Sequence, residues 1–234
     1  MVSTQGKQRY MGDEAAAIMK SNFKNTPMNI KRLIGRKFSE PEVRDLPVHL
    51  VLSKRLKPSA VLQMKEEMAR TPGLTFTELE NGNIGVEVQY NDETVTLSME
   101  QCVAMMLTKL CKITMRATDA KPGDCVVSIP AYYTDSQRAS MLQACDIAQL
   151  HCLRLLHEGT AVALEYGMFK SAKGQFDAAK PSPVMFLDFG QSSFTVTIAA
   201  FTTGKLVIKA SECDRSLGGR DFDEVRDFDW ILFV

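Results

Sequence analysis

The stretch that decides the fold is "VMFLDFGQSSFTV", residues 184–196, in which an apolar strand ends in an aspartate and a glycine before a second strand begins. An aspartate at the end of a buried strand costs free energy unless something binds it. Gly190 permits a tight turn, in which the amides of residues 190–193 can point inward together and bind an anion, helped by two serine hydroxyls. Asp188 would then hold a magnesium ion through its water shell. Taken alone, the pattern also fits a simple turn.

The composition is that of an ordinary globular protein, with 234 residues of which 45% are hydrophobic and 24% charged. The chain has 28 basic residues (lysine plus arginine) and 28 acidic residues (aspartate plus glutamate). The formal net charge is therefore zero, and no overall electrostatic field favours binding to nucleic acid or an acidic membrane. The apolar runs are far too short to span a bilayer, and the N-terminus lacks the hydrophobic core of a signal peptide. We therefore expect neither a nucleic-acid nor a membrane partner.

The cysteines form neither a CxxC motif nor a zinc-like spacing, and most lie in apolar stretches. This pattern indicates reduced core thiols and a reducing compartment such as the cytosol. The six are Cys102, Cys111, Cys125, Cys145, Cys152 and Cys213.

Capping residues mark the starts of the expected helices. Ser98 with Gln101 and Thr134 with Gln137 form two capping boxes, each followed by an apolar stripe at helical spacing. The stretch "EGTAVALEYGMF" (158–169) also has a helical pattern.

A short helix is expected near the N-terminus, with Thr26 as its N-cap, Pro27 as its first residue and Gly35 just past its end. No strand or helix pattern precedes Gln5. Further along, a helical pattern covers residues 60–70 of an otherwise atypical, proline-rich region.

Two hairpins are predicted, one turning at Asn91–Asp92 and one at residues 202–204. Strands and helices alternate first, and an antiparallel meander follows. This order indicates an α/β fold with a mixed sheet. The expected strands cover residues 84–90, 95–97, 125–129, 152–156, 184–188, 194–200 and 206–210.

The stretch "SLGGRDFDEV" (216–225) places the pair Gly218 and Gly219 directly before a helical pattern. Paired glycines allow a phosphate to approach a helix N-terminus closely. An ordinary loop fits the same residues equally well.

Five stretches in one order resemble the nucleotide-binding domain of the seventy-kilodalton heat-shock chaperones. The resemblance implies the actin-like ATPase (ribonuclease H-like) fold, in the form of most of the first lobe plus the opening sheet of the second. The run "DFGQSSFTVTIAAF" is closer to the large hundred-and-ten-kilodalton branch, whose members work as nucleotide exchange factors and holdases. The five stretches are "KNTPMNIKRLIGRKF" (24–38), "IPAYYTDSQR" (129–138), "LLHEGTAVALEYG" (155–167), "FLDFGQSSFTVTI" (186–198) and "SLGGRDFDEV".

The resemblance implies catalytic roles for three residues in binding and hydrolysing ATP with Mg²⁺. Lys31 would reach the γ-phosphate. Glu158 and Asp188 would order magnesium and the attacking water. Without the family resemblance, the sequence alone would indicate that Lys31 is a solvent-exposed helix residue and that Glu158 is a charged residue at the start of a helix.

The other implied roles concern ATP or ADP binding and the relay of nucleotide state to a substrate-binding part. Pro130 and Arg138 match the relay positions, although they also read as a strand terminator and a surface charge. The phosphate-cradling residues would be Gly190, Gln191, Ser192, Ser193, Gly218 and Gly219.

The chain departs from the common chaperones near the expected metal. Thr195 stands where they keep a second acidic residue, and Gly159 replaces a proline, which would loosen the turn after Glu158.

The resemblance leads us to expect an incomplete domain. The family's first phosphate hairpin would precede Val2, and its adenosine-binding helices would follow residue 225. The segment 44–63 and the apolar tail 226–234 have no counterpart in the family, which suggests gene-model errors or alternative splicing rather than a divergent paralogue. Such a chain would bind nucleotide poorly and hydrolyse it hardly at all.

Three parts are expected along the chain. Residues 1–98 would form the outer subdomain of the first lobe, 99–180 its core subdomain, and 181–234 the start of the second lobe.

The favoured function is therefore that of a portion of an ATP-binding heat-shock chaperone. It would assist protein folding in the cytoplasm, with the nucleus as a second compartment. Its partners would be another heat-shock chaperone and unfolded client proteins. One alternative is a non-catalytic module that docks on another chaperone. Another is an unrelated phosphotransferase of the actin fold.

Overall fold

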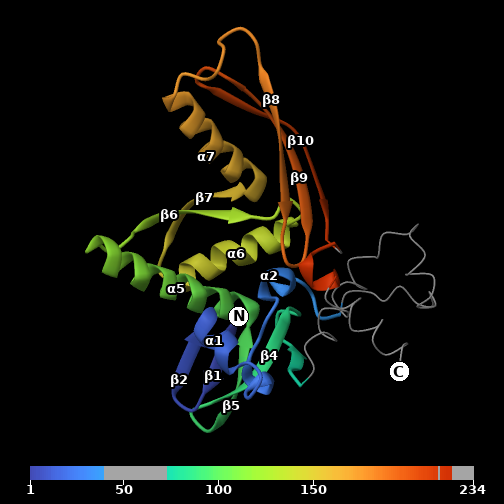
Figure 1. Ribbon diagram of the computed structural model, residues 1–234. Coiled ribbons are helices and arrows are strands. Elements are labelled where there is room, and N and C mark those ends of the chain that lie inside the picture. Colours follow the sequence, from blue (N-terminus) through green and yellow to red (C-terminus); the bar gives the residue numbers. More distant parts are fainter. Residues whose placement is uncertain (40–72, 216, 223–234) are drawn as a thin grey trace, which may run out of the picture. The chain divides into compact units, whose positions relative to one another are not determined.

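The structure is a computed structural model that describes residues 1–39, 73–215 and 217–222 (Figure 1). The described chain is mixed α/β, as predicted, and divides into two compact units. Unit 1 comprises Met1–Cys125 and Thr134–Leu153, and unit 2 comprises Val126–Tyr133 and the chain from Arg154 onward. The expected helix over residues 60–70, the segment 44–63 and the tail 226–234 lie outside the described residues.

Unit 1 begins with a hairpin of β1 (Val2–Gln5) and β2 (Gln8–Met11), which pair in antiparallel fashion. The expectation that nothing regular precedes Gln5 is therefore wrong. Ser3 and Thr4 are as buried as Val2. Because buried positions of this strand hold polar residues, the pattern of apolar residues did not predict the strand. A hydrogen bond satisfies the buried Ser3 hydroxyl, whereas the buried Thr4 hydroxyl has no partner among the described residues. The Asn22 side-chain amide donates to the Thr4 carbonyl at 2.7 Å, and the Ser3 and Thr26 hydroxyls lie 2.8 Å apart.

The short elements of unit 1 that follow the hairpin are α1 (Asp13–Ile18), the 3₁₀ helix η1 (Phe23–Asn25) and α2 (Ile30–Leu33). Thr26 does not cap α2, which starts later than predicted, after Asn29 in a left-handed conformation. The Thr26 hydroxyl instead donates to the Asn22 carbonyl at 2.7 Å. This contact ties Thr26 to the preceding turn, so the expected N-terminal helical residues remain irregular.

A three-stranded antiparallel sheet follows, with β3 (Thr75–Glu78), β4 (Ile84–Tyr90) and β5 (Glu93–Ser98) in that spatial order. Asn91 and Asp92 both have positive φ, as a two-residue hairpin turn of type I′ requires, so the predicted turn is confirmed.

Helix α5 (Met99–Thr118) begins at the predicted capping box, in which the Gln101 amide donates to the Ser98 hydroxyl at 3.1 Å. The second capping box opens α6 (Asp135–Ile147), with Thr134 and Gln137 in the corresponding roles. Helices α5 and α6 pack together within unit 1.

The strands β6 (Asp124–Ile129) and β7 (His151–His157) form a two-stranded sheet, and α6 connects them along the chain. The His151 amide donates to the Gly123 carbonyl at 3.0 Å, so the two strands start side by side and run parallel.

Unit 2 contains α7 (Glu158–Ala172) and an antiparallel sheet of β8 (Ser182–Phe189), β9 (Phe194–Thr202) and β10 (Lys205–Asp214). The middle strand is β9, and the predicted turn between β9 and β10 is present (Figure 1). Phe201 on β9 is buried against α7 and stacks on Phe176 with ring centroids 5.0 Å apart. The core of unit 2 therefore forms between α7 and one face of this sheet.

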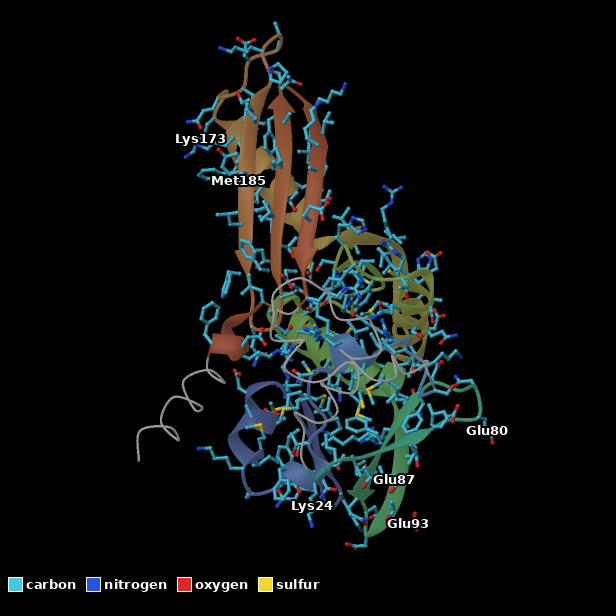
Figure 2. All side chains as sticks on the ribbon, turned by 90° about the vertical axis from the view of Figure 1, so that its right-hand side faces the viewer. Lys24, Glu80, Glu87, Glu93, Lys173 and Met185 are labelled. Atoms are coloured by element: carbon cyan, nitrogen blue, oxygen red, sulfur yellow. The ribbon has the colours of Figure 1, made fainter. Side chains whose placement is uncertain are left out.

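The opposite face of the sheet carries apolar side chains that are exposed within the described residues. Met185 on β8 has an exposed fraction of 59% and projects from the sheet (Figure 2). The other large exposed side chains on this face are Leu187, Phe189 and Ile198. No helix of the described chain is both long and apolar enough to cross a membrane.

Candidate phosphate-binding site

The turn after Asp188 is a tight hairpin connection between β8 and β9. The Gly190 amide donates to the Ser193 carbonyl at 3.0 Å, which closes the turn. The expectation that all four amides of residues 190–193 point inward is therefore wrong for Gly190. Among the described residues, the Gln191 and Ser193 amides have no backbone acceptor, so they remain suited to an anion.

Asp188 is exposed rather than buried and lies near the end of the edge strand β8. The sequence argument that its carboxylate needs a partner to offset burial is thus incorrect. An exposed carboxylate is instead suited to hold a hydrated magnesium ion, which keeps several of its waters.

The glycine pair docks directly on this turn. The Gly219 amide donates to the Gly190 carbonyl, and the Arg220 amide donates to the Gln191 carbonyl, both at 3.0 Å. A Cβ atom on Gly218 would lie 2.3 Å from the Gln191 carbonyl oxygen and 2.5 Å from the Ser192 nitrogen. Only glycine therefore allows the loop to approach this closely. The structure brings together all six residues predicted to cradle phosphates.

Asp188 belongs to a row of side chains across one face of the sheet. Thr195 pairs with Asp188 on one side and with Cys213 on the other, and directly paired residues share a face. The Thr195 side chain lowers the pKa of the Cys213 thiol, against the larger rise that burial causes. Cys213 is a neighbour of the site that the sequence analysis missed. The predicted β9–β10 hairpin, extended without interruption, would have placed Glu212 opposite Thr195, and the register shift between Ile208 and Ala210 puts Cys213 there instead.

Helix α7 brings Glu158 to the same end of this face. Gly159 packs against Thr197, which lies two residues along β9 from Thr195. Burial raises the pKa of the Cys213 thiol, and the Glu158 carboxylate adds to this rise, so these two groups lie near each other. The N-terminus of α7 also carries partial positive charge, which favours an anion at this end of the helix.

Pro130 lies in a turn that reaches Glu158 through Tyr133. The Tyr133 amide donates to the Pro130 carbonyl at 3.2 Å. Burial raises the pKa of the Tyr133 hydroxyl well above its usual range, and the carboxylate of Glu158 contributes to the shift. The Arg215 guanidinium holds the same turn by donating to the Tyr132 carbonyl at 2.7 Å. Pro130, Glu158 and the sheet are thus linked within unit 2.

Lys31 and Arg138 lie in unit 1, on α2 and α6. The end of α2 packs on the start of α6, where the Ser136 hydroxyl donates to the Gly35 carbonyl at 2.7 Å. Gly35 has a positive φ of 67°, as expected for a residue that ends a helix. Lys31 is exposed, so its ammonium group is accessible to solvent. The two predicted residues of unit 1 therefore sit on adjoining helices.

The sheet that carries the Asp–Phe–Gly turn, with α7 packed on one face, fits part of the actin-like ATPase class of proteins, to which the family match assigns the chain. The sequence model of the family described as Hsp70 protein matches residues 1–72 and 57–231. The chain belongs to this family, which confirms the family and fold predicted from the five motifs.

Curated relatives cover nearly the whole chain. A "97 kDa heat shock protein" of Strongylocentrotus purpuratus is 40% identical over 99% of this chain and 23% of the relative. "Heat shock 70 kDa protein 4" of Homo sapiens is 39% identical over 96% of this chain and 24% of the relative. "Heat shock 70 kDa protein 16" of Arabidopsis thaliana is 37% identical over 96% and 26%. The chain thus spans about a quarter of the length of these relatives, and relatives of this kind fit the predicted large branch.

Proposed function

We propose that this chain carries part of the nucleotide site of a large-branch heat-shock chaperone. In its full-length form, the chaperone binds ATP and assists protein folding as a nucleotide exchange factor and holdase. The observation that carries this proposal is the docking of the Gly218–Gly219 loop on the turn after Asp188, with Glu158 at the same end of the sheet. Its partners would be another heat-shock chaperone and unfolded client proteins, and its location would be the cytoplasm, with the nucleus as a second compartment.

The residues of unit 2 fit a magnesium nucleotide through three features. The exposed Asp188 carboxylate suits hydrated Mg²⁺, and the Gln191 and Ser193 amides suit phosphate oxygens. Gly218 keeps the loop and turn together without a Cβ atom between them. When bound, magnesium would neutralise phosphate charge and order water. Glu158 would orient that water. The resemblance assigns to Lys31, in unit 1, the role of a compact cation at the γ-phosphate.

Thr195 weakens this site relative to the common chaperones. It places a hydroxyl opposite Asp188 where those chaperones keep a second carboxylate. One acidic side chain fewer lowers the attraction for a divalent cation. The substitution therefore favours an exchange-factor and holdase role over rapid hydrolysis.

We expect the 234-residue chain to bind magnesium–ADP weakly, with a Kd above about 100 µM, or roughly −5.5 kcal/mol. The reason is that the proposed ligands of unit 2 provide one carboxylate opposite a hydroxyl and two turn amides. Isothermal titration calorimetry measures the affinity directly. Binding near 1 µM, roughly −8 kcal/mol, would contradict the weakened site.

Replacing Thr195 with aspartate should create a magnesium-dependent pair with Asp188. Like charges directly opposite each other on a sheet destabilise it, by about 0.2–1 kcal/mol. Thermal unfolding of Thr195→Asp should therefore show a lower Tm without magnesium and a recovered Tm with it. The matched control is Thr195→Asn, which adds no charge. An equal response of both variants to magnesium would show that Asp188 does not face the metal.

A further inference from the structure

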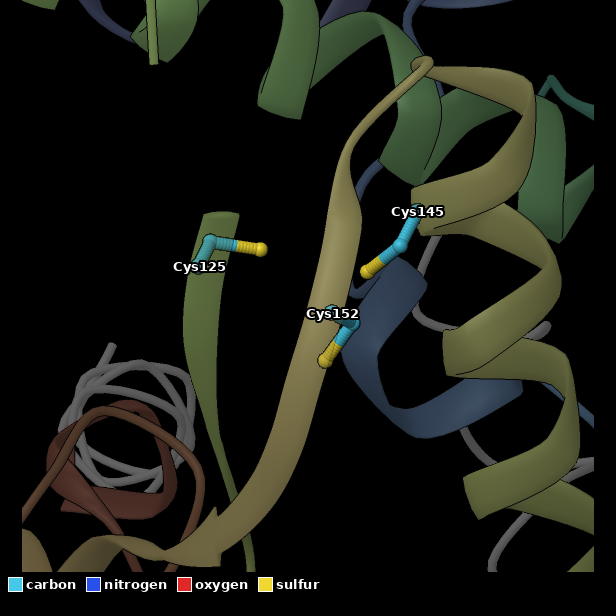
Figure 3. Close-up of side chains that lie close together, drawn as sticks. All are labelled: Cys125, Cys145 and Cys152. Atoms are coloured by element: carbon cyan, nitrogen blue, oxygen red, sulfur yellow. The ribbon is translucent and has the colours of Figure 1, made fainter. Parts of the chain in front are cut away.

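Three cysteines that lie far apart in the sequence meet in unit 1. The sulfur atoms of Cys125 on β6, Cys145 on α6 and Cys152 on β7 all lie within 4.8 Å of one another. Figure 3 shows the sulfur atoms of Cys125 and Cys145 turned toward β7, the strand that carries Cys152. The expected reduced thiols are thus present, but the spacing in the sequence did not indicate that these three would meet.

The β6–α6–β7 connection explains how the three thiols come together. Cys125 and Cys152 are each the second residue of a strand, and the bond from His151 to Gly123 holds the two strand starts side by side. The last turn of α6 returns to this end of the strands, where the Leu150 amide donates to the Cys145 carbonyl at 2.9 Å. All three thiols are thus carried by hydrogen-bonded elements, which position ligands more rigidly than loops do.

The thiols interact with one another electrostatically. Burial raises the pKa of Cys145 to about 12, and the neighbouring Cys152 and Cys125 add to this rise. Burial also raises the pKa of Cys125, with further contributions from Cys152 and from Cys111 on α5. A cation that prefers sulfur would compensate the thiolate charges.

The donor set points to a soft metal ion of low coordination number. In the described part of the chain, no histidine nitrogen or carboxylate oxygen joins the three sulfur atoms within the same distance. Asp124 and His151 directly precede two of the cysteines, so strand alternation turns them to the other face. There they contact each other at 2.8 Å in an exposed pair. Structural zinc sites almost always have four ligands, whereas thiolates also select monovalent copper.

We propose that Cys125, Cys145 and Cys152 form a three-coordinate site for a monovalent copper ion. Binding would form three copper–sulfur bonds and release the thiol protons to water, with no change in oxidation state. Cys145 is fully buried, with an exposed fraction of 0%, while the other two thiols are half-buried. An ion can therefore enter past Cys125 and Cys152 and be shielded on the side of Cys145. The three cysteines are not among the residues of the proposed nucleotide site.

The test is an anaerobic titration of the reduced 234-residue chain with monovalent copper, in competition with a chromophoric copper chelator. We expect one tightly bound copper ion, with an ultraviolet thiolate-to-copper absorption band. Cys125→Ser, Cys145→Ala and Cys152→Ser should each weaken binding at least about 100-fold, which is the upper end of the effect of losing a supporting residue around a metal. Circular dichroism should show that each variant remains folded.

The matched controls are Cys102→Ser and Cys213→Ser, which remove thiols outside the cluster and should leave copper binding unchanged. Zinc, tested in the same way, should bind far more weakly. Two results would overturn the proposal: unchanged copper affinity in a folded Cys145→Ala variant, or zinc binding as tight as that of copper. If one cluster variant unfolds, the other two carry the comparison.

Discussion

Replacing Gly218 with alanine should separate the glycine loop from the turn after Asp188. The new Cβ would lie 2.3–2.5 Å from backbone atoms of Gln191 and Ser192, and backbone cannot move aside as a flexible side chain can. Overpacking of this kind costs about 1–3 kcal/mol. The two bonds that Gly190 and Gln191 accept from the loop would break or lengthen, each a loss of about 0.5–1.5 kcal/mol.

Hydrogen exchange at the Gly219 and Arg220 amides measures this effect locally, because these two groups donate the bonds between loop and turn. Both amides should exchange at least about 10-fold faster in Gly218→Ala, which corresponds to roughly 1.4 kcal/mol of local stability. The matched control is the neighbouring Gly219→Ala, whose Cβ would meet its nearest atoms at an ordinary 3.9 Å. Equal exchange in both variants would show that the loop does not depend on the close approach at Gly218.

Replacing Gly159 with alanine should push the first turn of α7 away from β9. The added Cβ would lie 2.1 Å from the Thr197 hydroxyl oxygen and 2.9 Å from the Thr197 Cβ. Thr197 is buried, with an exposed fraction of 2%, and its hydroxyl lies 3.2 Å from that of Ser211. We therefore expect a loss of about 2 kcal/mol in the free energy of unfolding, since neither partner can leave the interface easily. Glu158 would move with the helix.

A double-mutant cycle with Thr197→Ala separates this clash from other effects. Removing the hydroxyl and methyl groups of Thr197 should restore at least about 1 kcal/mol to the Gly159→Ala variant, as expected for residues in contact. Chemical denaturation gives the four free energies. Gly123→Ala is the matched control, because a Cβ there meets nothing within 4 Å and should cause no loss. Additive losses in the cycle would contradict direct contact between Gly159 and Thr197.

The sequence analysis expected Gly159 to loosen the turn after Glu158, but the structure gives this glycine a different role. The absence of a side chain permits a close helix–sheet approach, and the common chaperones' proline would bring a Cβ to the same place. Sequence comparison identified the position as a departure from the family. Its consequence depended on Thr197, which is 38 positions further along the chain and becomes a neighbour only in the folded protein.

The features that were correctly predicted are those decided by residues close together in the sequence. Ser98 and Gln101 satisfy each other's backbone groups three residues apart, and Asn91–Asp92 forms a turn without help from the rest of the chain. The family motifs are also continuous stretches. Each of these signals is read locally, so tertiary structure was not needed to recognise them.

The sequence by itself therefore determined the mixed α/β class, the family, the capping boxes and the hairpins. Only the tertiary structure decided that Thr26 bonds backward instead of capping α2, that Asp188 is exposed, and that Gly218 must lack a side chain. It alone brought together Cys125, Cys145 and Cys152. The physical reason is that burial, close packing and metal-ligand geometry depend on which distant residue becomes a neighbour, whereas capping and turn formation depend on adjacent backbone groups.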